Sequence, residues 1–214
     1  MLSPTESPSC SHRHHSHCMS IYPLRTLEYT TSENKKIINC TIKDLENHGI
    51  SEWVGYSVGW TAQLYIMQGN GDKAYKMLCD FFNFNCTDNG FHVNGDFKRK
   101  TDFNMKYRLF TLEGNFIATD AIQEMLLYSE WGKIKLFPAL PTDWKFAEFE
   151  NLRAFGGLLI SSRMENGRIS YLEIKAAADC EFSILNNLSH LSSSMPLKEH
   201  SRITLKTDEI LIFE

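Results

Sequence analysis

The pattern of hydrophobic residues changes at Trp131 and Gly132, and this change constrains the fold more than any other feature of the sequence. Before it, apolar residues recur at the spacing of helices. After it, they follow the short runs and the alternation of strands. Helices followed by strands, without alternation between them, are typical of a segregated α+β chain. We therefore predict two domains, a mainly helical one over residues 1–132 and an antiparallel β domain over residues 133–214.

Three helices are predicted in the first part. The clearest follows Asp72, a good N-cap residue. One face of this helix carries an apolar stripe, formed by Ala74, Met77, Leu78, Phe81 and Phe82. Residues 57–67 are apolar on nearly every side, as in a helix that is buried on several sides. The turn at 70–72 would join this helix to the helix after Asp72 as an antiparallel pair. After a long polar connection over residues 83–109, a third helix is expected from about Phe116 to Glu130.

The second part predicts a series of short strands. Residues 157–165 and 168–177 flank Asn166–Gly167, a pair that suits the two positive φ angles of a type I′ hairpin turn. In the second strand of this hairpin, one face is formed by Leu172, Ile174 and Ala176. Further strands are expected at residues 133–137, 180–185, 202–206 and 209–213, with a serine-rich loop at 186–200.

Composition excludes several classes of protein. The chain has 214 residues, of which 43% are hydrophobic and 22% charged, and this usage excludes disorder along the whole length. The net charge of −4 and the lack of a dominant basic run argue against a nucleic-acid or anionic-membrane partner. No apolar run approaches the roughly 18–20 residues that cross a bilayer.

The sequence leaves the cellular compartment open. Residues 1–11 lack the cationic start and the apolar core of a secretory signal. Three Asn-x-Ser/Thr sequons, at Asn39, Asn85 and Asn187, would be glycosylation acceptors in a secreted protein, although such triplets often arise by chance. The six cysteines are scattered, and they fit disulfides in an exported protein and buried thiols in a cytosolic one equally well.

Four of the eight histidines lie in the segment His-Arg-His-His-Ser-His at residues 12–17, between Cys10 and Cys18. Imidazole and thiolate groups bind zinc, but this spacing matches no regular structural zinc pattern. Arg13 and the imidazoles would also suit hydrogen bonds to a sugar or an anion. From the residues alone, a solvated polar segment is the first interpretation, a polar ligand contact the second and a metal site the last. We expect no metal and no cofactor.

Residues 55–59, Gly-Tyr-Ser-Val-Gly, match the nucleophile elbow of serine hydrolases. That turn requires a buried strand directly before it, whereas the preceding residues here are polar and interrupted by Gly49. Ser57 is therefore more simply interpreted as a residue at the start of a helix.

Glu113 and Asn115 flank Gly114 just before the predicted third helix. A carboxylate at this place could polarise a water or orient an amide, and a helix N-terminus favours the ionised form. Gly114 lets the backbone turn tightly or approach a ligand. The simpler interpretation is that Glu113 and Asn115 cap the helix, and the residues alone favour the cap by about two to one.

Four ordered segments of the chain, taken together, resemble the C-terminal third of the family 95 glycoside hydrolases, the inverting α-L-fucosidases and their relatives. The segments are residues 12–23, 55–78, 110–144 and 151–169. The third is the most specific, since it contains a Gly-Asn-Phe turn, a helix ending in Glu-Met-Leu-Leu, and Leu-Phe-Pro-Ala-Leu-Pro followed by a tryptophan.

The resemblance implies an architecture for the chain. Members of the family have an N-terminal β domain, an (α/α)6 barrel and a C-terminal β domain. The chain would contain the last barrel helices followed by a small antiparallel β-sandwich, and the N-terminal part of the same enzyme would be missing. The full-length protein would enter the secretory pathway or be extracellular. Its substrate would be a glycan with terminal α-linked fucose or a similar L-sugar.

The resemblance also implies a catalytic position. Inversion needs a general acid on one side of the glycosidic bond and a base that activates water on the other. In this family an Asn assisted by an acidic residue activates the water, and the acidic residue lies in the pattern Phe-x-Ile/Leu-Asp/Glu-Gly-Asn-Phe. This pattern places Glu113 and Asn115 in the catalytic site. Glu113 stands where Asp is common, and Ile117 stands where a small residue is usual.

Arg13 and His14, and more weakly His17, resemble the sugar-contacting edge of the barrel. The general acid and the water-positioning Asn of the family have no match in this chain. A chain with only one side of the site cannot complete the reaction, so we expect the isolated chain to be inactive, and poorly soluble because inner helices would be exposed. The alternative function is a non-catalytic, carbohydrate-binding remnant of the same fold.

Overall fold

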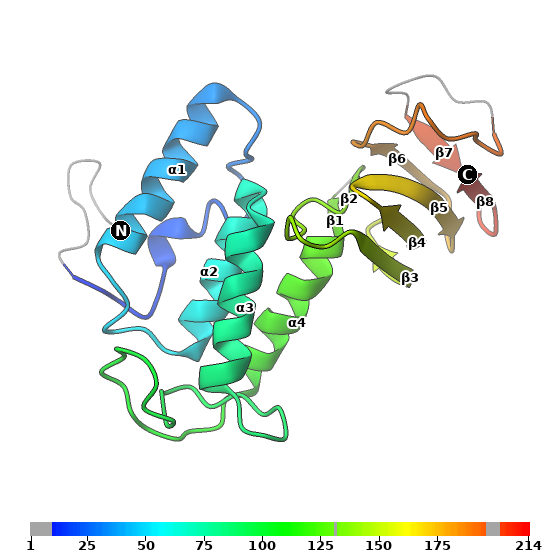
Figure 1. The fold of residues 1–214 in the computed structure, drawn as a ribbon. Helices are drawn as coiled ribbons and strands as arrows, with labels where there is room; N and C mark the ends of the chain where they lie inside the picture. Colours follow the sequence, from blue (N-terminus) through cyan, green and yellow to red (C-terminus); the bar gives the residue numbers. More distant parts are fainter. Residues whose placement is uncertain (1–9, 131, 196–201) are drawn as a thin grey trace. The chain divides into compact units, whose positions relative to one another are not determined.

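The computed structural model describes residues 10–130, 132–195 and 202–214 (Figure 1). The chain divides into two compact units, residues 1–122 and 123–214. The first is helical and the second consists mainly of strands, so the predicted α+β class is confirmed. Among the described residues, no helix is long and apolar enough to span a membrane.

The described part of the helical region contains one short 3-10 turn and four α-helices. These are η1 (Ser16–Cys18), α1 (Ser32–Asn47), α2 (Gly55–Gln68), α3 (Gly71–Asn85) and α4 (Leu112–Leu126). Helix α1 was absent from the predicted elements, because its apolar stripe has only three buried members, Ile38, Ile42 and Leu45. Its start is fixed by Thr31, whose side chain accepts a hydrogen bond from the Asn34 N–H at 3.1 Å.

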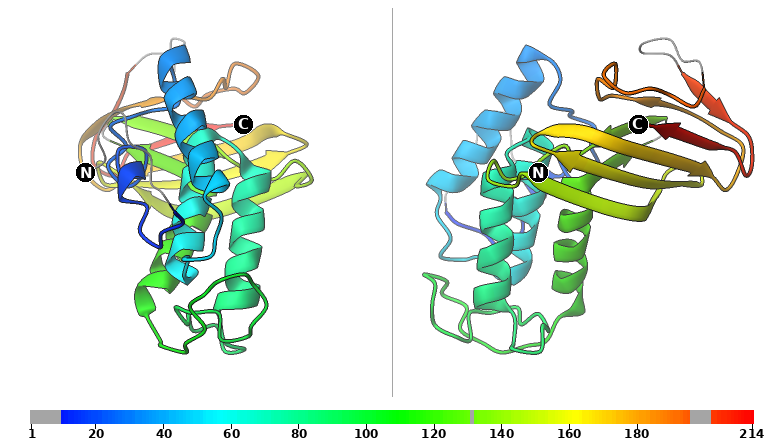
Figure 2. Two further views of the ribbon diagram at one scale, coloured as in Figure 1. Left: turned by 90° about the vertical axis from the view of Figure 1, so that its left-hand side faces the viewer. Right: turned by 45° about the vertical axis from the view of Figure 1, so that its right-hand side comes forward.

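Helices α2 and α3 pack against each other as the predicted pair (Figures 1 and 2). Helix α2 is buried on several sides, as its sequence predicts. It ends at Gly69, whose left-handed φ of 77° few other residues adopt readily. The N-cap of α3 is Asn70 rather than the predicted Asp72, since the Asn70 side chain accepts from the Lys73 N–H at 3.2 Å. Phe82 is also exposed, so the buried stripe is narrower than predicted.

Helix α4 begins at Leu112, four residues before the predicted start, so Glu113 and Asn115 lie inside its first turn. It also ends earlier than predicted, because residues 127–130 leave the helix as a strand. Ile117 is buried in the interior of the helical unit. A Cβ atom on Gly59 of α2 would lie 2.5 Å from the Ile117 Cγ2 atom, so the absence of a side chain at Gly59 makes room for Ile117.

The connection between α3 and α4 has no helix or named strand, as predicted, but it is well organised. Isolated bridges pair Cys86 with His92 and Val93 with Phe110. The buried Asp96 carboxylate accepts hydrogen bonds from the Lys100 and Thr101 backbone N–H groups, the Thr101 hydroxyl and the Lys106 ammonium group. Burial alone would raise the pKa of Asp96, but these donors lower it to about 2.

Eight strands in the described residues form two four-stranded sheets. The first has the order β1-β2-β6-β7 and the second the order β3-β4-β5-β8. The strands are β1 (Leu127–Glu130), β2 (Lys133–Leu136), β3 (Phe146–Ala154), β4 (Leu158–Glu165), β5 (Arg168–Ala176), β6 (Cys180–Ile184), β7 (Ile203–Leu205) and β8 (Ile210–Phe213). All pairs are antiparallel except β2 with β6, so the expectation of a fully antiparallel domain is wrong at that pair.

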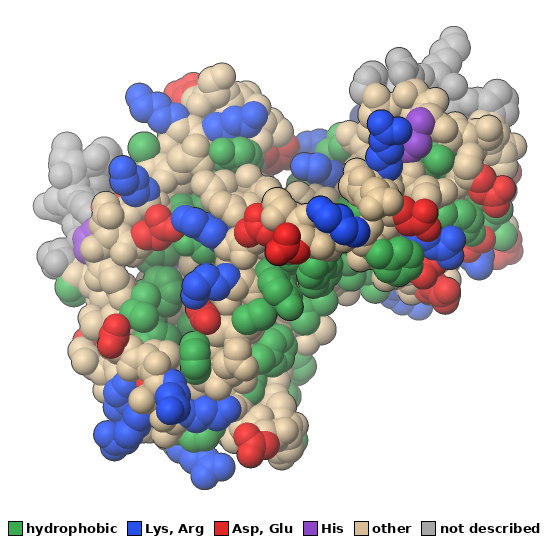
Figure 3. All heavy atoms as spheres, in the orientation of Figure 1, with side chains coloured by type: hydrophobic (Ala, Val, Ile, Leu, Met, Phe, Trp, Pro, Cys, Tyr) green, Lys and Arg blue, Asp and Glu red, His purple; other side chains and the backbone are tan. Residues whose placement is uncertain are grey.

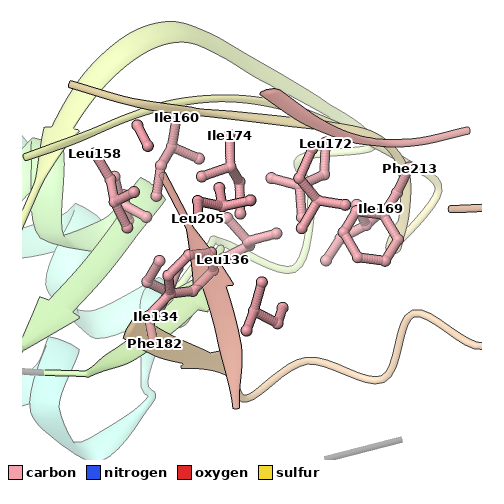
Figure 4. Close-up of a cluster of buried hydrophobic side chains, with 14 of the residues drawn as sticks. Ile134, Leu136, Leu158, Ile160, Ile169, Leu172, Ile174, Phe182, Leu205 and Phe213 are labelled. Carbon is pink, nitrogen blue, oxygen red and sulfur yellow. The ribbon is translucent and has the colours of Figure 1, made fainter. Parts of the chain in front are cut away.

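One hydrophobic core joins the two sheets (Figure 4). Leu136 and Leu205 from the first sheet meet Leu158, Leu172 and Ile174 from the second. The β4–β5 hairpin turns as predicted, with φ angles of 50° at Asn166 and 79° at Gly167. The part of the serine-rich loop at residues 196–201 lies outside the described residues.

Candidate catalytic site

The first turn of α4 holds both residues that the family pattern assigns to catalysis. The Glu113 side chain is exposed, and its charge acts on two neighbours, Tyr56 in the first turn of α2 and His92 in the connection. Burial raises the pKa of Tyr56, and the Glu113 carboxylate raises it further. The His92 ring lies against both Gly55, the first residue of α2, and Gly114, the residue after Glu113, so Glu113 lies close to the beginning of α2.

Both polar atoms of the Asn115 side-chain amide form hydrogen bonds with the connection between α3 and α4. Its Oδ1 atom accepts a hydrogen bond from the His92 N–H at 2.9 Å, and its Nδ2 atom donates to the Gly90 carbonyl at 2.8 Å. Neither bond closes on the N-terminus of α4, so the capping interpretation is wrong for Asn115. With both amide atoms engaged by backbone groups, Asn115 acts by holding the connection against the first turn of α4.

The backbone of Arg13, the residue before His14, is attached to the start of α2. The Ser57 hydroxyl donates to the Arg13 carbonyl at 2.8 Å and accepts from the Val54 N–H at 3.2 Å. Both the Arg13 and His14 side chains are exposed. The first turn of α2 thus connects the two groups of predicted residues, because Ser57 holds Arg13 while the adjacent Tyr56 lies near Glu113.

The bonding of Ser57 also decides between the interpretations of residues 55–59. Ser57 is fully buried and lies in the first turn of α2, where its hydroxyl is shared between two backbone groups. The prediction of a helix start is confirmed. A hydrolase nucleophile needs a hydroxyl exposed to substrate, and the structure provides none at this position.

The histidines of residues 12–17 have different surroundings. His15 is fully buried, with its ring centroid 5.1 Å from that of Trp53 and 5.7 Å from that of Trp60, and burial lowers its pKa to about 4. Burial also lowers the pKa of the half-buried His17. Within the described part of the chain, no three His, Cys, Asp or Glu side chains come together as a metal site. The solvated-segment interpretation is therefore wrong for His15, which is a core residue.

The Asp120 carboxylate, two turns of α4 beyond Glu113, links α2 and α4 through hydrogen bonds. The sequence did not indicate this role. The Asp120 Oδ2 atom accepts hydrogen bonds from the Tyr22 hydroxyl at 2.6 Å and from the Gln63 Nε2 atom at 2.7 Å. The Trp60 ring N–H donates to the Tyr22 carbonyl at 3.1 Å. The only available sequence signal was the seven-residue spacing of Glu113 and Asp120, which places both on one side of a helix.

Comparison with known proteins identifies the family of the chain. The model of the glycosyl hydrolase family 95 catalytic domain matches residues 2–126, and that of the glycoside hydrolase family 95 C-terminal domain matches residues 128–213. The chain is also 30% identical over 166 residues to Alpha-L-fucosidase 2 of Arabidopsis thaliana. That match covers 77% of this chain and 19% of the relative, so the chain spans a minor part of the relative's length. The catalytic-domain match extends over more than half of the residues, and the chain therefore belongs to glycoside hydrolase family 95.

Proposed function

We propose that this chain is the C-terminal part of an inverting α-L-fucosidase, which hydrolyses terminal α-linked fucose or a similar L-sugar from a glycan. The observation that carries the proposal is the position of Glu113. It is an exposed carboxylate in the first turn of α4, near the first turn of α2, to which the backbone of Arg13 is hydrogen-bonded. The name of the Arabidopsis relative supports the choice of sugar.

In this proposal Glu113 assists the activation of the attacking water, since a carboxylate near the sugar can accept a proton or orient the group that does so. Asn115 belongs to the catalytic site as the residue that holds the first turn of α4 to the connection. Arg13 and His14 donate hydrogen bonds to the sugar hydroxyls. His17 has a smaller share in binding, because its ring is half-buried.

The general acid is proposed to come from the remaining part of the same enzyme. An inverting site places its two carboxyl groups on opposite sides of the bond, about 6.5–9.5 Å apart. Glu113 supplies one side, and residues 1–214 have no match to the family's general acid. The chain alone is therefore proposed to be inactive, and the six-hairpin (α/α)6 barrel would be completed by residues upstream of it.

The proposal is tested by reading the transcript upstream of Met1 and expressing the longest open frame. We expect the longer product to release the aryl group from an aryl α-L-fucoside, and residues 1–214 alone to release none. Glu113→Gln in the longer product should lower kcat by about 10²-fold or more, with KM nearly unchanged. The matched control is Glu33→Gln, which changes an exposed carboxylate in the first turn of α1 and should leave kcat unchanged.

Full activity of the longer Glu113→Gln variant would refute the assignment of Glu113. Fucoside hydrolysis by residues 1–214 alone would refute the proposal that the general acid lies elsewhere.

The alternative, a non-catalytic carbohydrate-binding remnant, is favoured by one observation. The exposed Arg13 and His14 side chains are available to a sugar without any general acid. Calorimetric titration of residues 1–214 with L-fucose separates the two functions when combined with the assay. Binding without hydrolysis by either product would favour the remnant, and hydrolysis by the longer product would exclude it.

A further inference from the structure

His92 lies where three helices meet, although it belongs to none of them. Its backbone pairs with Cys86 just after α3, and its carbonyl accepts from the Thr111 N–H just before α4 at 3.4 Å. The next residues reach α2, because the Asn94 carbonyl accepts from the Gly55 N–H at 2.8 Å. The side chain of His92 is fully buried among these helix ends.

Two glycines make room for the imidazole ring. A Cβ atom on Gly55, the first residue of α2, would lie 2.1 Å from the His92 Nε2 atom. A Cβ atom on Gly114, in the first turn of α4, would lie 2.1 Å from the Nδ1 atom. The Phe81 ring of α3 stacks on the imidazole at 5.1 Å with an interplanar angle of 13°. The ring therefore contacts the backbone of two helix N-termini directly, at a separation that any side chain on either glycine would prevent.

Polar contacts fix the ring as well. The Nδ1 atom lies 2.6 Å from the Thr111 carbonyl oxygen and 2.9 Å from the Thr111 hydroxyl. Because a carbonyl only accepts, Nδ1 carries the proton and donates it to Thr111, the residue directly before α4. Burial lowers the pKa of His92, so the ring is neutral and Nε2 is unprotonated. The His92 N–H adds the second tie to α4 through Asn115 Oδ1.

We propose that His92 is a positioning residue for Glu113, because its ring and its N–H hold the first turn of α4 at a fixed place against the first turn of α2. Glu113 directly precedes Gly114, the residue on which the ring packs, so a shift of the ring moves the carboxylate relative to Tyr56. The catalytic meaning of this position rests on the proposed role of Glu113. The placement itself rests on the contacts of Gly55, Gly114 and Asn115.

Two substitutions of His92 separate the effect of its hydrogen-bond donor from the effect of its side-chain volume. His92→Leu fills much of the space but removes the hydrogen bond to Thr111. His92→Asn is smaller, but its side-chain N–H₂ group replaces the Nδ1 donor at a similar distance from the backbone. If the donor holds α4, the asparagine variant should keep the helix start in place and the leucine variant should not. Asn115→Ala removes the other tie and leaves the buried ring intact, so it reports on the same turn even where His92→Leu fails to fold.

Amide hydrogen exchange of residues 1–214 at low protein concentration, where self-association is suppressed, measures this directly when it is followed by mass spectrometry. In His92→Leu the amides of Phe116, Ile117 and Ala118, the first hydrogen-bonded turn of α4, should exchange about tenfold faster, the effect of losing one hydrogen bond. Amides in the middle of α2 should change much less. His92→Asn should restore slow exchange at the start of α4, and Asn115→Ala should accelerate it.

The matched control is Leu78→Ala, which removes a buried side chain of α3 three residues before Phe81 and loosens the helical unit generally. Equal acceleration in α2 and α4 of His92→Leu, as in the control, would overturn the proposal, because His92 would then be a packing residue only. Unchanged exchange at the start of α4 would overturn it too.

These exchange rates do not depend on fucosidase activity, so the two proposals fail separately. Selective loosening of α4 together with a fully active Glu113→Gln variant would refute the proposed function and leave the placement by His92 intact. Uniform exchange together with an inactive Glu113→Gln variant would refute the role of His92 alone.

Discussion

Two buried histidines, His15 and His92, make the helical unit sensitive to acid. Burial lowers the pKa of His15 from 6.5 to about 4 and lowers that of His92 as well. Below pH 6.5 the unfolded chain therefore binds protons that the folded chain does not. The free energy of unfolding should be highest above this pH and fall as the pH decreases, and His15 contributes up to about 1.4 kcal/mol per pH unit down to its folded-state pKa of about 4. His92 acts in the same direction.

Urea unfolding at pH 7.5 and pH 5 checks this prediction, with tryptophan fluorescence as the signal because Trp53 and Trp60 lie beside His15. The midpoint should be clearly lower at pH 5. In His15→Gln the difference between the two midpoints should shrink. Equal midpoints for the unsubstituted chain at the two pH values would contradict the prediction.

At the same scale, the candidate site was predictable only where a residue belongs to a local pattern. Glu113 and Asn115 stand out through the Leu-Glu-Gly-Asn-Phe segment and its resemblance to a family. His92 and Asp120 have no such local signal, because their roles depend on partners 19 or more residues away, such as Thr111 and Gln63. The sequence around residue 92 gives no reason to expect a buried ring between two glycines.

At the scale of elements, agreement between sequence and structure follows the strength of local turn and periodicity signals. The Asn166–Gly167 hairpin was predictable because its two positive φ angles require that chemistry. Strand β3 was not predicted, since a bulge between Phe149 and Leu152, with a φ of 53° at Asn151, interrupts the alternation of buried and exposed residues. Helix α4 starts earlier than predicted, because Gly114 was expected to form a turn before the helix. The structure places it inside the first turn, where it makes room for the His92 ring.

The β4–β5 turn allows a clean measurement of backbone strain. Gly167 has a φ of 79°, and a Cβ atom added there would meet no heavy atom within 4 Å. Gly167→Ala should therefore destabilise the β unit by about 1–2 kcal/mol through conformation alone. Thermal or urea unfolding measures the change, and Glu165→Ala, at the exposed end of β4, should stay within about 0.5 kcal/mol of the unsubstituted chain. A neutral Gly167→Ala would show that the turn relaxes into another type.

At the scale of the whole molecule, several large apolar side chains are exposed on the helical unit near the start of α4. Figure 3 shows apolar side chains among the charged ones on this unit. Phe116 and Leu109 are each 64% exposed, and Phe110, Phe91 and Leu112 are more than two-fifths exposed. Exposed patches of this kind favour association in water. The (α/α)6 barrel proposed above would cover such a surface.

We expect residues 1–214 to self-associate or to be poorly soluble, as measured by the soluble fraction after expression and by light scattering at several concentrations. The double substitution Phe110→Ser and Phe116→Ser should raise the soluble fraction several-fold, because it removes two large exposed rings. Phe146→Ser is the matched control, since Phe146 is 56% exposed but lies in β3. A soluble, monomeric chain without substitutions would contradict this expectation.

The contact between Gly59 and Ile117 makes the effects of substitutions at the two positions depend on each other. A Cβ atom at position 59 would lie 2.5 Å from Ile117 Cγ2, so alanine at 59 forces the Ile117 side chain to move. A smaller side chain at 117 would leave room for that Cβ atom. The two positions therefore form an epistatic pair, and Gly59→Ala should be more costly beside Ile117 than in an Ile117→Ala background.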